Sequence, residues 1–300
     1  MSTLSNKTTC HGYHETKQHI EFMFPYNVYL CTIPDDFSSV FLHWQDTMEI
    51  IYIKKGAGTA QVDLRVFEVH AGDIIFIPPG HLHGLTQLRG QRMEYENIIF
   101  DLTFLGSAVI DICSQKYLLP ILNEQITFPV CLTPKDHGYT SISQCLDTAD
   151  TLCDCRTPGY ELGVKSSLMR LFSLLFQYGM MEEISASSAP QNLTNLKETL
   201  NYLESNYRHH ISIHDAALIC GYSESHFMRW FKEMTGTSFI QYLNRYRLEK
   251  AFDLLKTSDK TILEISSEVG FDNLSNFNRL FKKHFGTTPR SMRKSFPSGS

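Results

Sequence analysis

The fold is decided by residues 270–289, which read GFDNLSNFNRLFKKHFGTTP. Gly270 predicts a tight corner, because only glycine enters the left-handed backbone region without steric cost. Asp272 is expected to cap the helix that follows, and Gly286 and Pro289 are expected to end it and prevent its resumption. The apolar residues fall on one helical stripe, which comprises Phe277, Leu280, Phe281 and Phe285. The stretch therefore predicts a glycine corner and then an amphipathic helix with a basic, amide-rich outer face.

A shorter helix is predicted directly before the corner, at residues 261–269 (TILEISSEV). Ile262, Ile265 and Val269 recur there at helical spacing. A short helix, a glycine corner and a second helix form the layout of a helix-turn-helix, whose second helix enters the major groove of DNA. Any short helical hairpin has a glycine corner, so a single match would be weak evidence.

The pattern occurs a second time, at residues 211–238 (ISIHDAALICGYSESHFMRWFKEMTGTS). Gly221 corresponds to Gly270, 49 positions later, and after one inserted residue the following positions correspond at an offset of 50. A duplicated recognition unit is hard to explain as accidental helix geometry. Between the copies, residues 239–256 have the pattern of a long amphipathic helix, which would fix the distance between the units. Adjacent major grooves on one face of DNA lie about 34 Å apart.

These stretches resemble the AraC/XylS family of bacterial transcription regulators, over the last third of the chain. The motifs that carry the resemblance are GYSESHFMRWFKEMTG and GFDNLSNFNRLFKKHFGTTP. The resemblance implies one all-α domain in which two helix-turn-helix units read successive major grooves. The predicted DNA-binding residues, at base edges or phosphates, are Ser225, His226, Met228, Arg229, Lys232, Leu274, Ser275, Asn278, Arg279, Lys282 and Lys283.

The side chains of this set differ in what they can read. Arginine can bind guanine through two hydrogen bonds, and asparagine can bind adenine in the same way. Leu274 could contact only a thymine methyl group, and Met228 is similarly unusual. Two alternatives stay open, since each Lys or Arg can be a solvated charge and Arg229 and Arg279 can form ion pairs within the domain. The residues predicted to be core are Phe227, Phe231, Phe277 and Phe281.

Charge is distributed unevenly along the 300 residues, whose net charge is −5. Residues 191–300 hold 15 Lys and Arg against 11 Asp and Glu, whereas the remaining 190 residues hold 12 against 21. The C-terminal part is therefore the one suited to phosphates. No apolar run approaches the ~20 residues that cross a membrane, and the N-terminus lacks a secretory signal. We expect a cytoplasmic protein of about two domains, without a membrane partner and with its eight cysteines reduced.

Residues 20–135 are expected to form a β-domain, because short apolar or β-branched runs are separated by glycine and proline. The predicted strands are 28–32, 49–54, 58–62, 73–77 and 97–100, with a break at Gly56. Alternation along residues 48–53 places Glu49, Ile51 and Ile53 on one strand face, which we expect to be inside.

Two local motifs in this region resemble the paired motifs of the cupin superfamily, a jelly-roll β-barrel. They are HWQ at residues 43–45 followed by Glu49, and PPGHLH at residues 78–83. The polar residues of the motifs form the candidate effector site, which comprises His43, Gln45, Glu49, His81 and His83. A barrel of this size can hold one small ligand, and such side chains suit hydroxyl groups. The resemblance to cupin-bearing AraC members implies a sugar or a related metabolite.

A metal ion is an alternative occupant of the barrel, since metal-binding cupins have ligands at the positions of His43, Gln45, Glu49 and His83. The ligand set of this alternative is His43, Glu49 and His83, because the amide oxygen of Gln45 is a poor ligand for borderline metals. The histidines can also be ordinary hydrogen-bonding residues. No cofactor is predicted.

Residues 136–180 are expected to contain two helices, at 141–154 and 160–178. The apolar stripe of the second comprises Leu162, Leu168, Leu171, Phe172, Leu175 and Phe176. Either it packs on the barrel of its own chain or it packs against a partner helix, and the family resemblance favours dimerisation here. The remaining boundaries are a flexible arm at 1–19, a linker at 181–195, a double helix-turn-helix domain at 196–295 and a disordered tail at 296–300.

The hypothesis is a ligand-responsive bacterial transcription regulator and not an enzyme. Its predicted partners are double-stranded promoter DNA, a small-molecule effector, a second copy of the chain and RNA polymerase. Two alternatives remain, namely a metal-binding cupin regulator or enzyme, and a regulator whose barrel is only a dimerisation scaffold. The sequence patterns of nucleophile elbows, phosphate-binding loops and dinucleotide-binding turns are absent.

Overall fold

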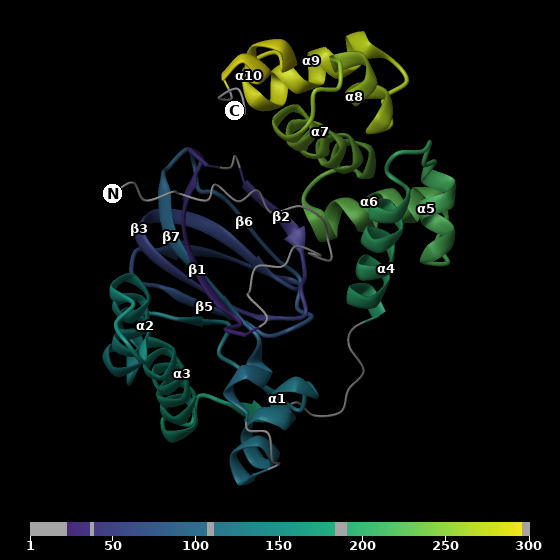
Figure 1. Ribbon diagram of the computed structural model, residues 1–300. Coiled ribbons are helices and arrows are strands. Elements are labelled where there is room, and N and C mark those ends of the chain that lie inside the picture. Colours follow the sequence, from purple (N-terminus) through teal and green to yellow (C-terminus); the bar gives the residue numbers. More distant parts are fainter. Residues whose placement is uncertain (1–22, 37–38, 107–110, 184–190, 296–300) are drawn as a thin grey trace. The chain divides into compact units, whose positions relative to one another are not determined.

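The computed structural model describes residues 23–36, 39–106, 111–183 and 191–295 (Figure 1). Contacts divide these residues into two compact units, one within 23–183 and one within 191–295. The arm expected at 1–19 and the tail expected at 296–300 lie outside the described residues, as do residues 184–190 of the expected linker. None of the helices in the described part of the chain combines the length and apolar character that crossing a membrane requires.

The N-terminal unit is built on antiparallel β-strands (Figure 1). The strands are β1 (Tyr26–Ile33), β2 (Ser39–His43), β3 (Met48–Val62), β4 (Arg65–His70), β5 (Ile74–Ile77), β6 (His83–Gln87), β7 (Met93–Phe100) and β9 (Cys131–Leu132). They follow the order β1-β7-β3-β5-β9, while β4 and β6 also pair with β3 and β2 pairs with β6. The predicted N-terminal β-domain is therefore confirmed.

Strand β3 is longer than predicted, because Gly56 does not end it. Residues 48–56 pair with β7, and residues 57–62 pair with β4 and β6. The register shifts between Ile53 and Lys55, and Gly56 takes φ 76°. A Cβ on Gly56 would lie 1.8 Å from the carbonyl oxygen of Arg92, so only glycine lets the strand bend here. The glycine that predicted a break instead lets one strand serve both layers of the barrel.

Both faces of β3 are buried. Ile51 and Ile53 lie in the barrel interior with Ile33, Val62 and Ile75, as predicted for this face. The opposite face, with Met48 and Ile50, lies in a second core shared with two helices. These helices are α2 (Tyr139–Cys155) and α3 (Tyr160–Gln177). Burial on both sides explains why residues 50–53 of the strand are all apolar or aromatic.

Helices α2 and α3 pack on the barrel of their own chain, which is the first of the two alternatives for the apolar stripe. Leu168, Leu171 and Leu175 are fully buried in the shared core, and Phe172 is 4% exposed. Leu162 was assigned to this stripe, but it is 76% exposed, so that assignment was wrong. The short elements around the helices are η1 (Leu102–Leu105), η2 (Ser114–Leu118), α1 (Leu119–Leu122), β8 (Ile126–Thr127) and β10 (Glu182–Glu183).

The C-terminal unit is all-helical, as predicted. Its helices are α4 (Gln191–Asn206), α5 (Ile213–Ile219), α6 (Glu224–Thr235), α7 (Phe239–Thr257), α8 (Ile262–Glu268), α9 (Leu274–Phe285) and α10 (Pro289–Ser295). Helices α5 and α6 form the first predicted unit, α8 and α9 the second, and α7 is the helix between them (Figure 1). Helix α4 begins at Gln191, five residues before the domain start expected at Leu196.

Local capping chemistry explains these helix boundaries. Ser212 with Asp215 and Thr261 with Glu264 form capping boxes at the starts of α5 and α8, so the two units begin in the same way. Helix α9 is capped by Asn273 and not by Asp272, because the residue inserted in this copy precedes the cap. Pro289 was expected to prevent helix resumption, but it is the first residue of α10, where its fixed φ is favourable.

The aromatic core predicted for the two units is confirmed. Phe227 and Phe231 of α6 and Phe277 and Phe281 of α9 are all fully buried. Phe231 contacts the ring of Phe239, the first residue of α7, at a centroid distance of 5.2 Å. The recognition helices are therefore held from behind by aromatic packing.

Candidate nucleic-acid interface and candidate effector site

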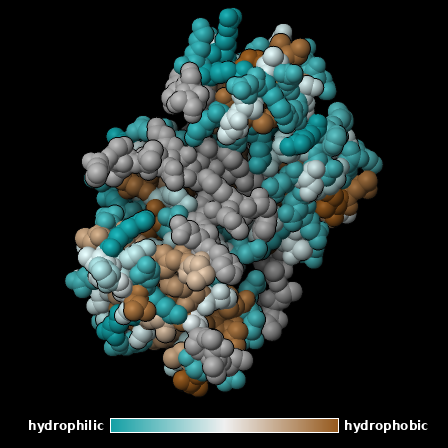
Figure 2. Space-filling view, viewed as in Figure 1, coloured by the Kyte–Doolittle hydropathy of each residue, from teal (hydrophilic) through white to brown (hydrophobic). Residues whose placement is uncertain are grey.

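The outer faces of α6 and α9 carry the predicted DNA-binding residues. All of them are exposed to solvent except Asn278, which is half-buried. On α9, Ser275, Arg279 and Lys282 follow one another at spacings of four and three, which places them on the side opposite Phe277 and Phe281. In Figure 2 the visible face of this unit is largely hydrophilic, with apolar residues scattered over it. A convex, basic helix face of this kind can enter a major groove.

The arginines of this interface are available for an external partner. Among residues 191–295, neither Arg229 nor Arg279 lies in an ion pair with a carboxylate, so the ion-pair alternative is not observed. The Nη2 atom of Arg279 donates to Oδ1 of Asn276 at 2.8 Å, which orients the guanidinium without neutralising it. Around α6, Glu224 pairs with His214 at 3.3 Å, and the ring of His226 lies 4.3 Å from that of Tyr222.

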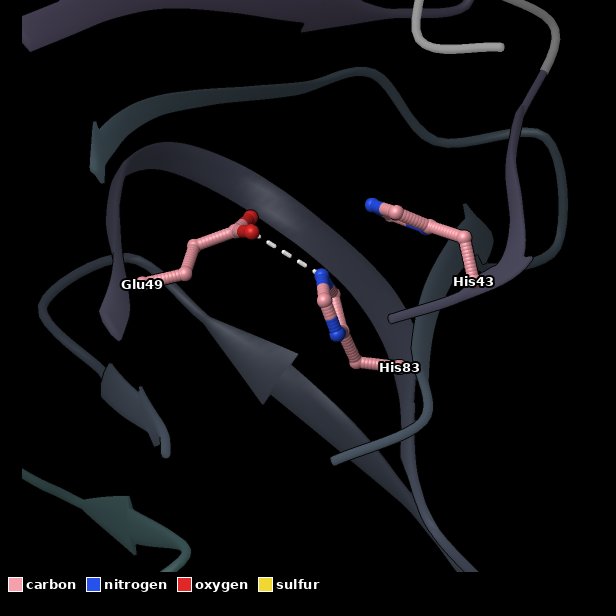
Figure 3. A group of neighbouring side chains, drawn as sticks. All are labelled: His43, Glu49 and His83. Atoms are coloured by element: carbon pink, nitrogen blue, oxygen red, sulfur yellow. Dashed lines mark hydrogen bonds and ion pairs between the residues drawn. The ribbon is translucent and has the colours of Figure 1, made fainter. Parts of the chain in front are cut away.

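A buried polar cluster lies at one end of the barrel interior, where β2, β3 and β6 meet (Figure 3). His43 at the end of β2 is the register partner of His83 on β6, and their rings lie 4.1 Å apart. Oε2 of Glu49, on β3, accepts from Nε2 of Gln45 at 2.7 Å and pairs with Nε2 of His83 at 2.9 Å. Each of these four side chains is at most 4% exposed.

The protons of this cluster follow from its geometry. Nδ1 of His83 donates to the carbonyl oxygen of His81 at 3.0 Å, while Nε2 faces the carboxylate of Glu49. One proton must therefore lie between His83 and Glu49, and the pair is either imidazolium with carboxylate or imidazole with carboxylic acid. Nδ1 of His43 donates to the carbonyl oxygen of Phe41 at 2.8 Å. The buried Oε1 of Gln45 has no hydrogen-bond partner among the described residues.

The side chain of His81 does not share the contacts of the other four candidates. Its Nδ1 pairs with Oδ2 of Asp63 at 2.7 Å, and Oδ1 of the same carboxylate accepts from the backbone N–H of Leu82. Asp63 has a positive φ of 51° and joins β3 to β4. Only the backbone carbonyl of His81 contacts the cluster, through His83.

The donor atoms of the cluster also fit a metal ion. His43, Glu49 and His83 each offer one ligand atom, and these atoms lie within 4.8 Å of one another. Two imidazoles and a carboxylate are a set that divalent transition metals accept. No other such group of three occurs in the described ranges. The seven cysteines within those ranges are free thiols.

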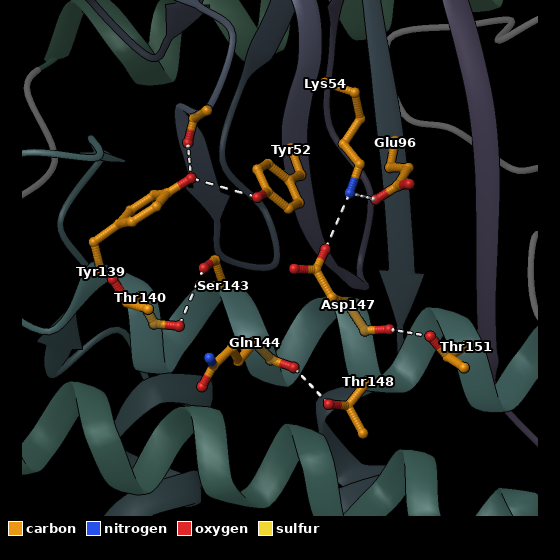
Figure 4. Close-up of polar contacts among 11 residues, drawn as sticks. Tyr52, Lys54, Glu96, Tyr139, Thr140, Ser143, Gln144, Asp147, Thr148 and Thr151 are labelled. Carbon is orange, nitrogen blue, oxygen red and sulfur yellow. Dashed lines mark hydrogen bonds and ion pairs between the residues drawn. The ribbon is translucent and has the colours of Figure 1, made fainter.

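A second polar cluster, under helix α2, was not foreseen from the sequence (Figure 4). Nζ of Lys54 on β3 lies 2.9 Å from Glu96 on β7 and 3.2 Å from Asp147 on α2. Burial raises the pKa of Glu96 to about 7 and raises that of Asp150 as well. The hydroxyl of Tyr139 donates to the carbonyl oxygen of Gly72 at 2.6 Å. The signal available in the sequence was Lys54, a charged residue directly after the apolar run at residues 50–53.

Comparison with known proteins finds a family model for each of the two compact units. Residues 27–148 match the AraC-like ligand binding domain, and residues 216–295 match the Helix-turn-helix domain. One match lies within the barrel unit and the other within the helical unit, and the chain belongs to the AraC family of transcription regulators.

Three similar proteins illustrate the coverage. The uncharacterized HTH-type transcriptional regulator YdeC of Bacillus subtilis is 26% identical over 93% of this chain and 95% of its own length. The transposon Tn10 TetD protein of Escherichia coli is 37% identical over 34% of this chain and 73% of its own length. The C-terminal domain of the response regulator yesN from Fusobacterium nucleatum is 30% identical, with a TM-score of 0.32, and covers 34% of this chain and 98% of that domain.

Proposed function

We propose that this protein is a ligand-responsive regulator that binds promoter DNA sequence-specifically, with α6 and α9 in adjacent major grooves of one site. The observation that carries the proposal is the pair of exposed helix faces that each present an arginine and at least one lysine. Each face is held by a buried aromatic core, and α7 joins the two. Within the described residues, Arg229 and Arg279 form no ion pair with a carboxylate, so their charges can act on base edges or phosphates, although one donor of Arg279 already binds Asn276. The protein would act in the bacterial cytoplasm, where the promoter DNA is located.

A binding assay with matched variants tests the DNA part. Duplexes are first enriched from a random pool with the full chain at moderate salt, and affinity is then measured by fluorescence anisotropy. Arg229→Ala and Arg279→Ala should each weaken specific binding by about 1–3 kcal/mol. The control is Arg65→Ala, which removes the same charge from an exposed position of β4 in the other unit. No enrichment over random duplex would refute sequence-specific binding.

We further propose that the barrel binds a small organic molecule with hydroxyl or amine donors, of which a sugar or related metabolite is the favoured class. The support is chemical. The buried Oε1 of Gln45 is an acceptor without a partner among the described residues, beside the acceptors of Glu49. An unsatisfied buried acceptor costs about 1–3 kcal/mol, which a ligand donor would recover. Ligand binding at this cluster would bias the regulator between two conformations.

A thermal-shift screen of monosaccharides, polyols and sugar acids tests this proposal. A true effector should raise the melting temperature of the full chain, and Glu49→Gln should abolish the rise while keeping nearly the same side-chain shape. His70→Ala, at an exposed position of β4, is the control. A rise that Glu49→Gln leaves intact would place the ligand elsewhere.

A bound divalent cation is the second candidate, because the ligand atoms of His43, Glu49 and His83 converge within 4.8 Å. Elemental analysis of protein purified without chelator distinguishes it from an organic effector. Stoichiometric metal that is lost in His83→Ala and retained in His70→Ala would favour the cation. Metal-free protein that responds to an organic ligand would exclude it.

We also propose that two chains pair through the outward side of α3, where Leu162 is 76% exposed while the rest of the apolar stripe is used by the barrel. Sedimentation analysis of the wild-type chain and of Leu162→Asp tests this, since the variant should be monomeric at concentrations where the wild type is dimeric. We propose in addition that the DNA-bound pair of chains contacts RNA polymerase. A wild-type monomer would contradict the pairing, and a barrel that pairs without any effector would favour the scaffold alternative.

A further inference from the structure

The segment that follows α4 belongs to the first helix-turn-helix unit in sequence but packs on the second. Tyr207 comes directly after α4 and ahead of α5. Its side chain nevertheless packs against the core of the second unit, which includes Leu248, Ile265 and Phe277. Its ring also lies 5.2 Å from that of Tyr246 on α7. The segment after α4 therefore links the two helix-turn-helix units by non-covalent contacts, in addition to the covalent link through α7.

Arg247 on α7 fastens this segment. It is 8% exposed, and its Nε donates to the carbonyl oxygen of Tyr207 at 2.8 Å. Its Nη2 donates to the carbonyl oxygen of His209 at 2.7 Å, and its guanidinium lies 5.9 Å from the ring centre of Phe271. A planar fork with several donors can hold two carbonyls at once, whereas a lysine ammonium cannot reproduce that geometry.

The corner glycine of the second unit contacts the same atoms. A Cβ on Gly270 would lie 2.5 Å from the carbonyl oxygen of Tyr207 and 3.0 Å from Nε of Arg247. The corresponding Gly221 of the first unit has a similar positive φ, 65° against 89°, but a Cβ there would meet nothing within 4 Å. The two corners thus share a backbone conformation, and only the second is packed against the opposite unit.

We propose that Arg247, the 207–209 carbonyls and Gly270 form a brace that fixes the separation of α6 and α9, and thereby the base-pair spacing that the protein accepts between its two half-sites. This inference rests on the proposed reading of one DNA site by both units. Each base pair added between half-sites moves them apart by about 3.4 Å and rotates them by about 35°. A rigid pair of recognition helices can follow neither change, whereas a loosened pair can.

The test uses the full chain and a duplex enriched with it from a random pool. Affinity is measured for the enriched duplex and for versions with one or two base pairs inserted or deleted between the half-sites. Wild type should lose about tenfold or more with each change, the equivalent of losing a base contact. Arg247→Lys and Gly270→Ala should bind the enriched spacing more weakly and lose less than about threefold when the spacing changes.

The control is Gly221→Ala, which imposes the same backbone strain at the corner that lacks the contact. It should lower affinity equally at every spacing, which is what a merely structural defect does. Folding of each variant is checked by circular dichroism. If Gly270→Ala fails to fold, Arg247→Lys still tests the brace, because it keeps the positive charge. A spacing profile for Arg247→Lys identical to that of wild type would overturn the brace. Failure to enrich any duplex, or enrichment of a single half-site, would instead overturn the proposed two-unit reading.

Discussion

Replacing Glu96 by glutamine should remove a pH-dependent loss of stability from the barrel unit. Burial opposes ionisation of this carboxyl, and the ion pair with Lys54 at 2.9 Å only partly offsets it, so the pKa is raised to about 7. In the unfolded chain a glutamic acid has a pKa of about 4.3. Between these two values the folded state binds more protons than the unfolded state, so stability falls as the pH rises. At about 1.4 kcal/mol per pH unit, a pKa difference of about 2.7 corresponds to a loss of at most about 4 kcal/mol, shared with the neighbouring carboxyl of Asp150.

The assay is urea unfolding of the full chain followed by tryptophan fluorescence from pH 5 to 8. The chain has two tryptophans, one in each unit, so the substitution Trp230→Phe leaves Trp44 to report on the barrel. Relative to this background, Glu96→Gln should gain stability progressively as the pH rises and reach a constant difference above about pH 7. Glu94→Gln is the control, because that carboxyl lies on the same strand and its hydrogen bond with Lys55 lowers its pKa. A difference between wild type and Glu96→Gln that does not change with pH would refute the reasoning.

Three further perturbations have defined outcomes. Lys283→Ala, on the exposed face of α9, should weaken DNA binding similarly for all sequences and reduce the slope of log affinity against log salt by about 1. Anisotropy titrations at several salt concentrations measure this slope, and an unchanged slope would show that Lys283 makes no phosphate contact. Tyr139→Phe removes the bond to the carbonyl of Gly72 and should lower the unfolding free energy of the barrel unit by about 1–2 kcal/mol in urea, with no change in DNA affinity. Phe231→Ala empties a fully buried position beneath α6 and should cost about 3–5 kcal/mol by the same method, so a loss below 1 kcal/mol would mean that the aromatic core can close over the gap.

The helical unit was predictable because its signals are local and occur twice. Apolar spacing, capping residues and corner glycines act within a few residues of one another, so Phe277 and Phe281 could be placed in the core without a structure. The one misplaced cap, Asp272 instead of Asn273, arose at the single residue by which the two copies differ in length. The brace at Arg247 could not be predicted, because it joins carbonyls about 40 positions earlier in the chain.

The β-domain was predictable in class but not in its connections. In the sequence, a glycine at position 56 indicates a turn. Only the structure, in which the carbonyl of Arg92 lies close to Gly56, shows that this residue bends a continuous strand. His43, Glu49 and His83 converge, as the resemblance to cupin motifs implied. The side chain of His81 instead bonds to Asp63, on a turn that no sequence pattern linked to it. The side that α3 turns to the barrel depends on the shape of the sheet, which is why Leu162 was misassigned.

The continuity of β3 has a mechanical consequence for the N-terminal unit. Ile51 points into the barrel, and its covalent neighbour Ile50 points into the layer where α2 and α3 rest. A molecule that pushes this strand outward therefore displaces, by the same amount, the strand surface on which both helices pack. No relay of side chains is needed, because the inner lining and the outer support are alternate residues of a single backbone.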